Sequence, residues 1–148
     1  MSDTSKAVEV LGRSSLFVGL KLDAIAAIAA LAREVRLEEG DDVYRLGDPA
    51  TAVYVVVSGR VRFSLGVGNR AAGAHTVMEA GEAFGWAALL GNEPRRVATA
   101  TCLEDSVLLS LDGSALTALF ERDTATGFTV MRRLADRISR DLLSALTT

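Results

Sequence analysis

The feature that most constrains the fold of this chain is a change of pattern near residue 35. From there to about residue 111, short runs rich in β-branched and aromatic residues are separated by glycines at positions 40, 47, 59, 66, 68, 73, 81, 85 and 91. Many short strands divided by turn residues are typical of a jelly roll or barrel rather than of a parallel sheet. The chain is therefore predicted to be mainly β, a double-stranded β-helix or jelly-roll barrel with flanking helices.

Two runs predict strands most clearly. In residues 60–67, apolar side chains alternate with polar or small ones, which is the period of a strand with one buried face. Residues 53–57 are continuously apolar and predict a more central strand. Residues 58–59, Ser-Gly, lie between these runs, so we expect them to form the turn of a hairpin. Residues 97–102 and 107–111 are expected to form another strand pair.

Both ends of the chain are expected to be helical, over residues 1–34 and 112–148. Residues 22–32 place Leu22, Ile25, Ile28 (or Ala29) and Ala32 at helical spacing, with strong helix formers between them. Near the other end, Asp112 or Ser114 is expected to cap a short helix that runs through Phe120.

A longer helix is expected from about residue 124 to residue 146. Apolar residues recur along it at spacings of three and four and form a heptad-like seam: Met131, Leu134, Ile138, Leu142 and Ala145 or Leu146. Arginines 132, 133, 137 and 140 are expected to lie mainly on its solvated face. The seam can pack on its own barrel or on the same helix of a second copy, and we favour a symmetric dimer.

Composition narrows the function. A chain of 148 residues suits a single domain over 1–148, and its net charge of −3 argues against a nucleic-acid-binding face. Neither the polar start nor the longest uncharged stretch, 49–59, suggests a signal peptide or a membrane span, so we expect a cytoplasmic protein. With a single histidine, His75, and a single cysteine, Cys102, no metal site, disulfide or catalytic set is expected.

Two stretches of the barrel region carry recognisable motifs. The first is LGDPA at 46–50 followed by YVVVSGRV at 54–61, and the second is FGWAALL at 84–90 followed by PRRVATA at 94–100. Together they resemble the cyclic-nucleotide-binding domain of catabolite-activator-type regulators, protein kinase A regulatory subunits and gated ion channels. The second stretch is similar to that family's phosphate-binding cassette, here residues 84–98. The resemblance covers nearly the whole chain.

The resemblance implies a non-catalytic ligand-sensing module that binds a cyclic nucleotide and signals through its last helix. We favour cAMP over cGMP as the ligand. The expected ligand-binding residues are Gly85, Trp86, Ala87, Arg96, Val97 and Ala98. The residues themselves fit this reading. A glycine lets a ligand approach the backbone, and the first N–H groups of the following helical turn lack internal partners. Arg96 could return toward them and pair with a phosphate.

One position departs from the family pattern. The family's nucleotide binders usually carry a glutamate after the Phe-Gly pair, which accepts a hydrogen bond from the ribose 2′-hydroxyl, whereas this chain has Trp86. An indole is a donor only, so it cannot replace that carboxylate. Glu93 or Glu82 is a weak candidate for a substitute. Losing a hydrogen bond to a charged group weakens binding roughly ten- to a hundred-fold.

The departure at Trp86 leaves a second interpretation open. The chain can be a degenerate module in which Trp86 fills the old pocket and the last helix serves dimerisation or docking of a protein partner. In this family, residues on the long helix cap the nucleotide base, and Arg137 falls roughly where such contacts occur. The chain ends within or just past that helix, so no helix-turn-helix or other DNA-binding element is expected in it.

Overall fold

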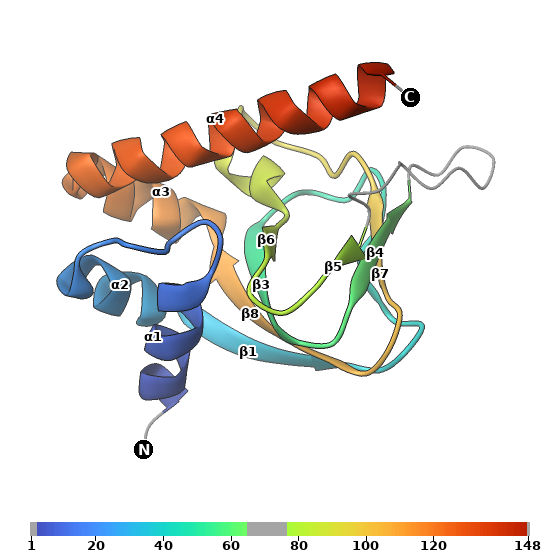
Figure 1. Cartoon of the computed structure of the whole chain (residues 1–148), viewed down its shortest axis with the longest axis horizontal. Helices are drawn as coiled ribbons and strands as arrows, with labels where there is room; N and C mark the ends of the chain where they lie inside the picture. Colours follow the sequence, from blue (N-terminus) through green and yellow to red (C-terminus); the bar gives the residue numbers. More distant parts are fainter. Residues whose placement is uncertain (1–2, 65–76, 148) are drawn as a thin grey trace.

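In a computed structural model of the chain, two four-stranded antiparallel sheets face each other and helices cover one end (Figure 1). The structure describes residues 3–64 and 77–147. The strands are β1 (Ala32–Leu37), β2 (Asp42–Tyr44), β3 (Ala52–Ser58), β4 (Val61–Ser64), β5 (Val77–Met78), β6 (Ala83–Phe84), β7 (Thr99–Cys102) and β8 (Ser106–Asp112). Their order is β1-β8-β3-β6 in one sheet and β2-β7-β4-β5 in the other, which confirms the predicted jelly-roll class.

The predicted central strand is confirmed, and both predicted strand pairs are wrong. β3 lies between β8 and β6, as its continuously apolar sequence predicted. However, β3 does not pair with β4, and β7 does not pair with β8, because the chain changes sheet at each of these turns. The two turns lie side by side, and the N–H of Leu103 donates to the carbonyl of Arg60.

Gly59 lies where the chain crosses from one sheet to the other instead of folding back as a hairpin. Its φ of 99° is in the region that favours glycine, and a Cβ there would lie 2.7 Å from the Cα of Ser106. The backbone therefore turns sharply against the start of β8. The predicted continuation of β4 through Leu65 and Val67, together with His75, lies outside the described residues.

The helices gather at one end of the barrel, and α4 runs along its top (Figure 1). They are α1 (Asp3–Arg13), α2 (Leu22–Ala29), α3 (Gly113–Arg122) and α4 (Thr124–Thr147). The Asp112 carboxylate accepts a hydrogen bond from the N–H of Ala115, which confirms Asp112 as a cap. The helix expected over residues 22–32 begins at Leu22 as predicted, although Leu22 is 82% exposed. It ends at Ala29, and Ala32 belongs to β1, so the predicted end is wrong. No helix of the described part is long and apolar enough to cross a membrane.

The apolar core has two parts, one on each face of the β3 sheet. Val55 packs with the helices, whereas its neighbour Val56 packs between the two sheets. Successive strand residues point to opposite faces, so a strand with both faces covered reads as a continuous apolar run. Cys102 lies in the inner core, where burial raises the pKa of its thiol.

The seam predicted on α4 divides into two halves. Leu134 is buried, and Met131 and Ile138 pack partly against the core of the same chain. Further along, Leu142 is 58% exposed and Leu146 is 72% exposed. Phe128, at the start of the helix, is 66% exposed. The side chain of Ala145, the alternative predicted for the end of the seam, lies outside the described set.

Candidate functional site

The predicted cassette begins where β6 ends against β3. Gly85 follows Phe84 with a φ of 80° and precedes a short 3-10 helix, η1 (Trp86–Leu89). A Cβ at residue 85 would lie 3.0 Å from Arg96 Nη1 and 3.2 Å from the carbonyl oxygen of Ala52. The predicted helical turn is therefore present, but it is a 3-10 turn and ends one residue earlier than expected. Its geometry requires glycine at residue 85.

Arg96 returns to the cassette, as its sequence position predicted. Nη1 donates to the carbonyl of Gly85 at 2.9 Å, and Nη2 donates to the carbonyl of Ala52 at 2.7 Å. The guanidinium carbon lies 4.0 Å from the centre of the Tyr44 ring, a cation–π distance. Burial lowers the pKa of this arginine, which nevertheless stays charged at neutral pH.

One donor of Arg96 is left without a partner. The side chain is 4% exposed, and Nε makes no hydrogen bond to any residue that the structure describes. A buried donor without an acceptor costs about 1–3 kcal/mol. The cassette therefore holds a charged group that an incoming anion can satisfy.

A cavity of about 140 Å³ opens beside Gly85 and Arg96. The six residues predicted to bind ligand all line it: Gly85, Trp86, Ala87, Arg96, Val97 and Ala98. Phe84, which opens the predicted cassette, also lines it, whereas sequence reasoning missed Tyr44, Phe63, Met78, Ala83 and Asp141. Phe63 could have been predicted to face the barrel interior, because it belongs to the apolar face of an alternating strand. No sequence pattern pointed to Tyr44 and Asp141, since they come from distant parts of the chain.

The inner wall of the cavity is aromatic. Phe84 stacks on Tyr54 with ring centres 5.4 Å apart and meets the ring of Phe63 edge-on at 5.5 Å. Tyr44 lies 6.2 Å from Phe84. Burial raises the pKa of Tyr44 to about 12. This wall offers a flat apolar surface next to the charge of Arg96, which suits a ligand with both an anionic group and a ring.

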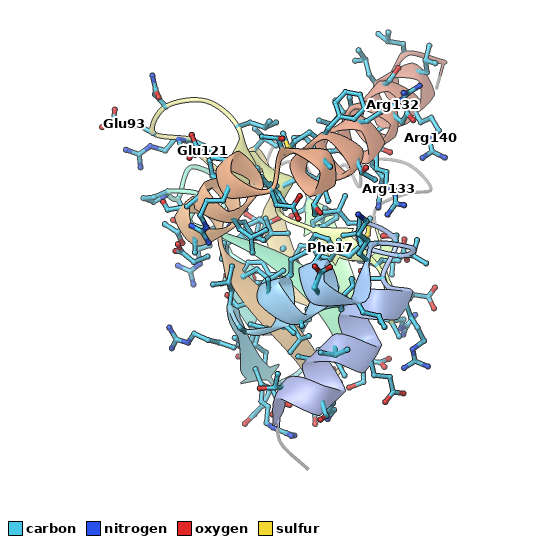
Figure 2. The ribbon with its side chains drawn as sticks, turned by 90° about the vertical axis from the view of Figure 1, so that its left-hand side faces the viewer. Phe17, Glu93, Glu121, Arg132, Arg133 and Arg140 are labelled. Atoms are coloured by element: carbon cyan, nitrogen blue, oxygen red, sulfur yellow. The ribbon has the colours of Figure 1, made fainter. Side chains whose placement is uncertain are left out.

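Helix α4 supplies the opposite wall. Arg137, whose orientation the sequence left open, lines the cavity together with Asp141. Arg137 Nη2 lies 3.3 Å from the sulfur of Met78 and 3.9 Å from the carboxylate of Glu82. Neither Glu82 nor Glu93 lines the cavity, and Figure 2 shows Glu93 on an exposed loop. The carboxylate at the cavity is therefore Asp141, not either of the two predicted substitutes.

Trp86 occupies part of the space without closing it. It is half-buried, packs against the core of the helical end, and lines the cavity. The remaining volume of about 140 Å³ lies below the roughly 300–1,000 Å³ of typical ligand sites. A nucleotide-sized ligand would therefore extend beyond this volume unless one wall moves. Within the described residues, no group of histidine, cysteine, aspartate and glutamate side chains is arranged to hold a metal ion.

Comparison with known proteins agrees with this geometry. The family model for the cyclic nucleotide-binding domain matches residues 34–123, more than half of the chain. The CRP-like cAMP-activated global transcriptional regulator of Mycobacterium tuberculosis is 28% identical over 136 residues, which cover 89% of this chain and 58% of that protein. A protein of Rhodopseudomonas palustris named as a potassium channel protein is 32% identical over 133 residues, 90% of this chain and 32% of that protein.

A solved structure extends the agreement to three dimensions. The regulatory domain of Toxoplasma gondii protein kinase A with cAMP superposes with a TM-score of 0.68 and 28% identity, over 78% of this chain and 44% of that one. The chain spans less than two thirds of the two curated relatives above. On the extent of the family match and the shared fold, the chain belongs to the cyclic nucleotide-binding domain family.

Proposed function

We propose that this cyclic-nucleotide-sensing regulatory module binds cAMP beside Gly85 and Arg96 and signals through α4, without catalysing a reaction. The observation that carries the proposal is the buried guanidinium of Arg96, which lines the cavity and whose Nε has no hydrogen-bond partner among the described residues. A phosphate oxygen there would accept a charge-assisted hydrogen bond. The N–H groups of Trp86 and Ala87, at the start of η1, are further donors for the same phosphate.

The rest of the cavity fits the other parts of a nucleotide. The aromatic wall offers a stacking surface for a base. Small side chains at Ala87 and Ala98 leave room beside the phosphate, and Val97 adds an apolar edge. Asp141 offers an acceptor for hydroxyl or amino donors of the ligand, a role that Trp86 cannot fill.

The size of the cavity links binding to signalling. A ligand of nucleotide size needs more than the present 140 Å³, so one wall must give way. Gly85, Arg96 and β3 are joined by hydrogen bonds, whereas Arg137 of α4 reaches the barrel through Met78 and a 3.9 Å ion pair with Glu82. We infer that α4 is the wall that moves, and that its displacement changes a contact with a partner.

The experiment is calorimetry and thermal melting with cAMP and cGMP, with 5′-AMP as a non-cyclic control. Free cAMP at a hundred times its Kd should stabilise the fold by about 2.7 kcal/mol. Arg96→Gln should abolish the shift, measured against its own ligand-free melting temperature. The control is Arg95→Gln, because Arg95 is exposed and bonds only weakly to the carbonyl of Gly47. No shift with either cyclic nucleotide at millimolar concentration would defeat the proposal.

The second candidate function is a module that keeps the fold for dimerisation or docking and no longer binds nucleotide. Trp86, which narrows the cavity, and the exposed apolar residues of α4 favour it. Trp86→Glu separates the two candidates. If the cavity still receives nucleotide, the restored carboxylate should tighten cAMP binding by roughly ten- to a hundred-fold. If only the variant binds, the natural chain is the degenerate module.

We further propose that the chain works in the cytoplasm as a homodimer joined through α4. Its described cysteine, Cys102, is a buried free thiol, as expected for a reducing compartment. The exposed apolar side chains of α4 include Phe128, Leu142 and Leu146, which lie along one side of the helix. Such a side is suited to the same helix of a second copy.

A further inference from the structure

A second pocket shares Trp86 as a lining residue with the nucleotide cavity. Its volume is about 150 Å³, and it lies between α4 and the turn that follows α1. Arg133, Arg137 and Arg140 line it from α4, and Leu16 lines it from the turn. We call it the arginine pocket. Figure 2 shows Arg133 and Arg140 along α4, with Phe17 of the turn beneath the helix.

The three arginines form one charged wall because of their spacing. Residues 133, 137 and 140 are four and three apart, so they share one face of the helix. Arg133 Nη1 donates to the carbonyl of Leu16 at 3.0 Å, which anchors the guanidinium at the pocket. Arg140 makes no hydrogen bond or ion pair with any residue in the described ranges.

Positive charge is in excess at this wall. Asp136 is the acidic residue that lines the pocket, and Glu82 faces Arg137 from the barrel at 3.9 Å. Three arginines and one aspartate thus line the pocket, while Glu82 and Asp141 lie outside it, Asp141 in the neighbouring cavity with Arg137. Of the three arginines, Arg140 is the one with neither a hydrogen bond nor an ion pair in the described part of the chain. Like charges on one helix face repel one another, so an added anion lowers the energy of the group. Arginine's planar fork matches a carboxylate in two parallel hydrogen bonds.

The floor of the pocket is apolar and sets the size of what can enter. It is formed by Leu16, Val53, Phe84, Trp86 and Leu134. A cavity of roughly 150 Å³ with such a lining holds a molecule the size of benzene. We propose that the arginine pocket is a second ligand site, for a small organic carboxylate with one ring or an equally small apolar body. Its carboxylate would lie against Arg140 and Arg133, and its apolar body against Trp86.

The site does not depend on nucleotide binding, but it borders the nucleotide cavity. Ala83, Phe84, Trp86 and Arg137 line both spaces. A ligand in the arginine pocket would therefore contact some of the same residues that a nucleotide would contact. Because binding free energies couple reciprocally, each ligand should alter the affinity for the other by an equal factor.

The test uses benzoate as the probe and Trp86 as the reporter, since Trp86 is the only tryptophan. Benzoate is titrated into the full chain without nucleotide, and the fluorescence of Trp86 is followed with excitation at 295 nm. A saturable change is expected, with no such change for benzamide, which is neutral and of the same shape. Inorganic phosphate at equal ionic strength tests whether charge alone suffices, and it should bind more weakly than benzoate.

Two variants at one exposed position report on the carboxylate. Arg140→Gln should weaken benzoate binding at least about fivefold, and Arg140→Glu should abolish it. The matched control is Arg132→Gln, because Arg132 is exposed on α4 and does not line the pocket. Thermal melting checks that each variant is folded. The proposal is overturned if benzoate gives no saturable change at millimolar concentration, if benzamide binds equally well, or if Arg140→Gln and Arg132→Gln behave alike.

Discussion

Arg96 has two roles, one in holding the cassette in place and one in offering a donor to a ligand. Its two Nη groups hold the carbonyls of Gly85 and Ala52 and so fasten the cassette to β3. Those two bonds position the guanidinium and use two of its five N–H donors, and the Nε–H has no acceptor among the described residues. A binding site built this way is preorganised, because the arginine pays its ordering entropy on folding rather than on binding.

The ionisation of Tyr44 is expected to lower the free energy of unfolding at alkaline pH. Burial raises the pKa of its phenol from 10.0 to about 12, because the ionised form is poorly solvated beneath Arg96. Below pH 10 the phenol is neutral in both the folded and the unfolded chain, and its contribution is fully present. Between pH 10 and 12 only the unfolded chain ionises, so stability falls by up to about 2–3 kcal/mol.

We therefore expect Tyr44→Phe to lose less stability than the natural chain between pH 10 and 12. Urea unfolding at pH 8, 10, 11 and 12 measures the difference, and the two curves should diverge only above pH 10. Identical pH dependence in the two proteins would show that Tyr44 ionises as readily in the folded state as in the unfolded one.

At the scale of elements, Gly127 lies where α4 packs closely against α3. It lies in the first turn of α4, and a Cβ there would meet the Cβ of Phe120 at 2.7 Å. Alanine is favoured over glycine within a helix by about 1 kcal/mol, but overpacking a buried contact costs about 1–3 kcal/mol. The steric cost is the larger of the two, so Gly127→Ala should lower the free energy of unfolding.

Gly12 provides the matched control for that substitution. It also lies in a helix, α1, and a Cβ there would meet nothing within 4 Å. Gly12→Ala should therefore raise the free energy of unfolding by about 0.5–1 kcal/mol, the difference in helix propensity alone. Urea denaturation measures both variants. If both variants raise the free energy of unfolding, then α3 and α4 can accommodate a Cβ at residue 127 and the expected clash with Phe120 does not occur.

Element by element, the sequence predicted where strands lie far better than how they pair. The apolar run of β3 and the alternation of β4 are local patterns, and both strands were found. The predicted pairing of β3 with β4 was wrong, because a serine-glycine turn between two apolar runs has the sequence pattern of a hairpin even where the chain changes sheet. The observed pairing joins segments that are distant in sequence: β3 pairs with β8, and Gly59 packs against Ser106, which is 47 residues away.

At the scale of the whole molecule, the same limit applies to the site. The cassette from Gly85 to Ala98 was predictable, because the residues that form it are close in sequence and form a motif. The opposite wall was not, because Asp141 reaches the cavity only through the angle at which α4 crosses the barrel. No local pattern encodes that angle, which depends on how Val130 and Leu134 pack on the shared core.

The whole molecule is also the scale at which the exposed apolar residues of α4 have a consequence. Phe128, Leu142 and Leu146 share one side of the helix, at 66%, 58% and 72% exposure. This apolar stripe is densest at Leu142 and Leu146, which are one helical turn apart, and a second copy packed there would remove both side chains from water. Light scattering after size exclusion should thus give twice the chain mass of 15.6 kDa at micromolar concentration.

A charge placed in the stripe should separate the copies. Leu142→Lys would bury an ammonium in the interface, which is unfavourable without a partner, so we expect it to shift the protein to monomer. Leu22→Lys is the matched control: the same substitution at a leucine that is 82% exposed on α2. It should leave the dimer intact. A natural chain that stays monomeric at high micromolar concentration, or a dimer that survives Leu142→Lys unchanged, would mean that α4 joins no second copy. The apolar side of α4 would then need another explanation than self-association.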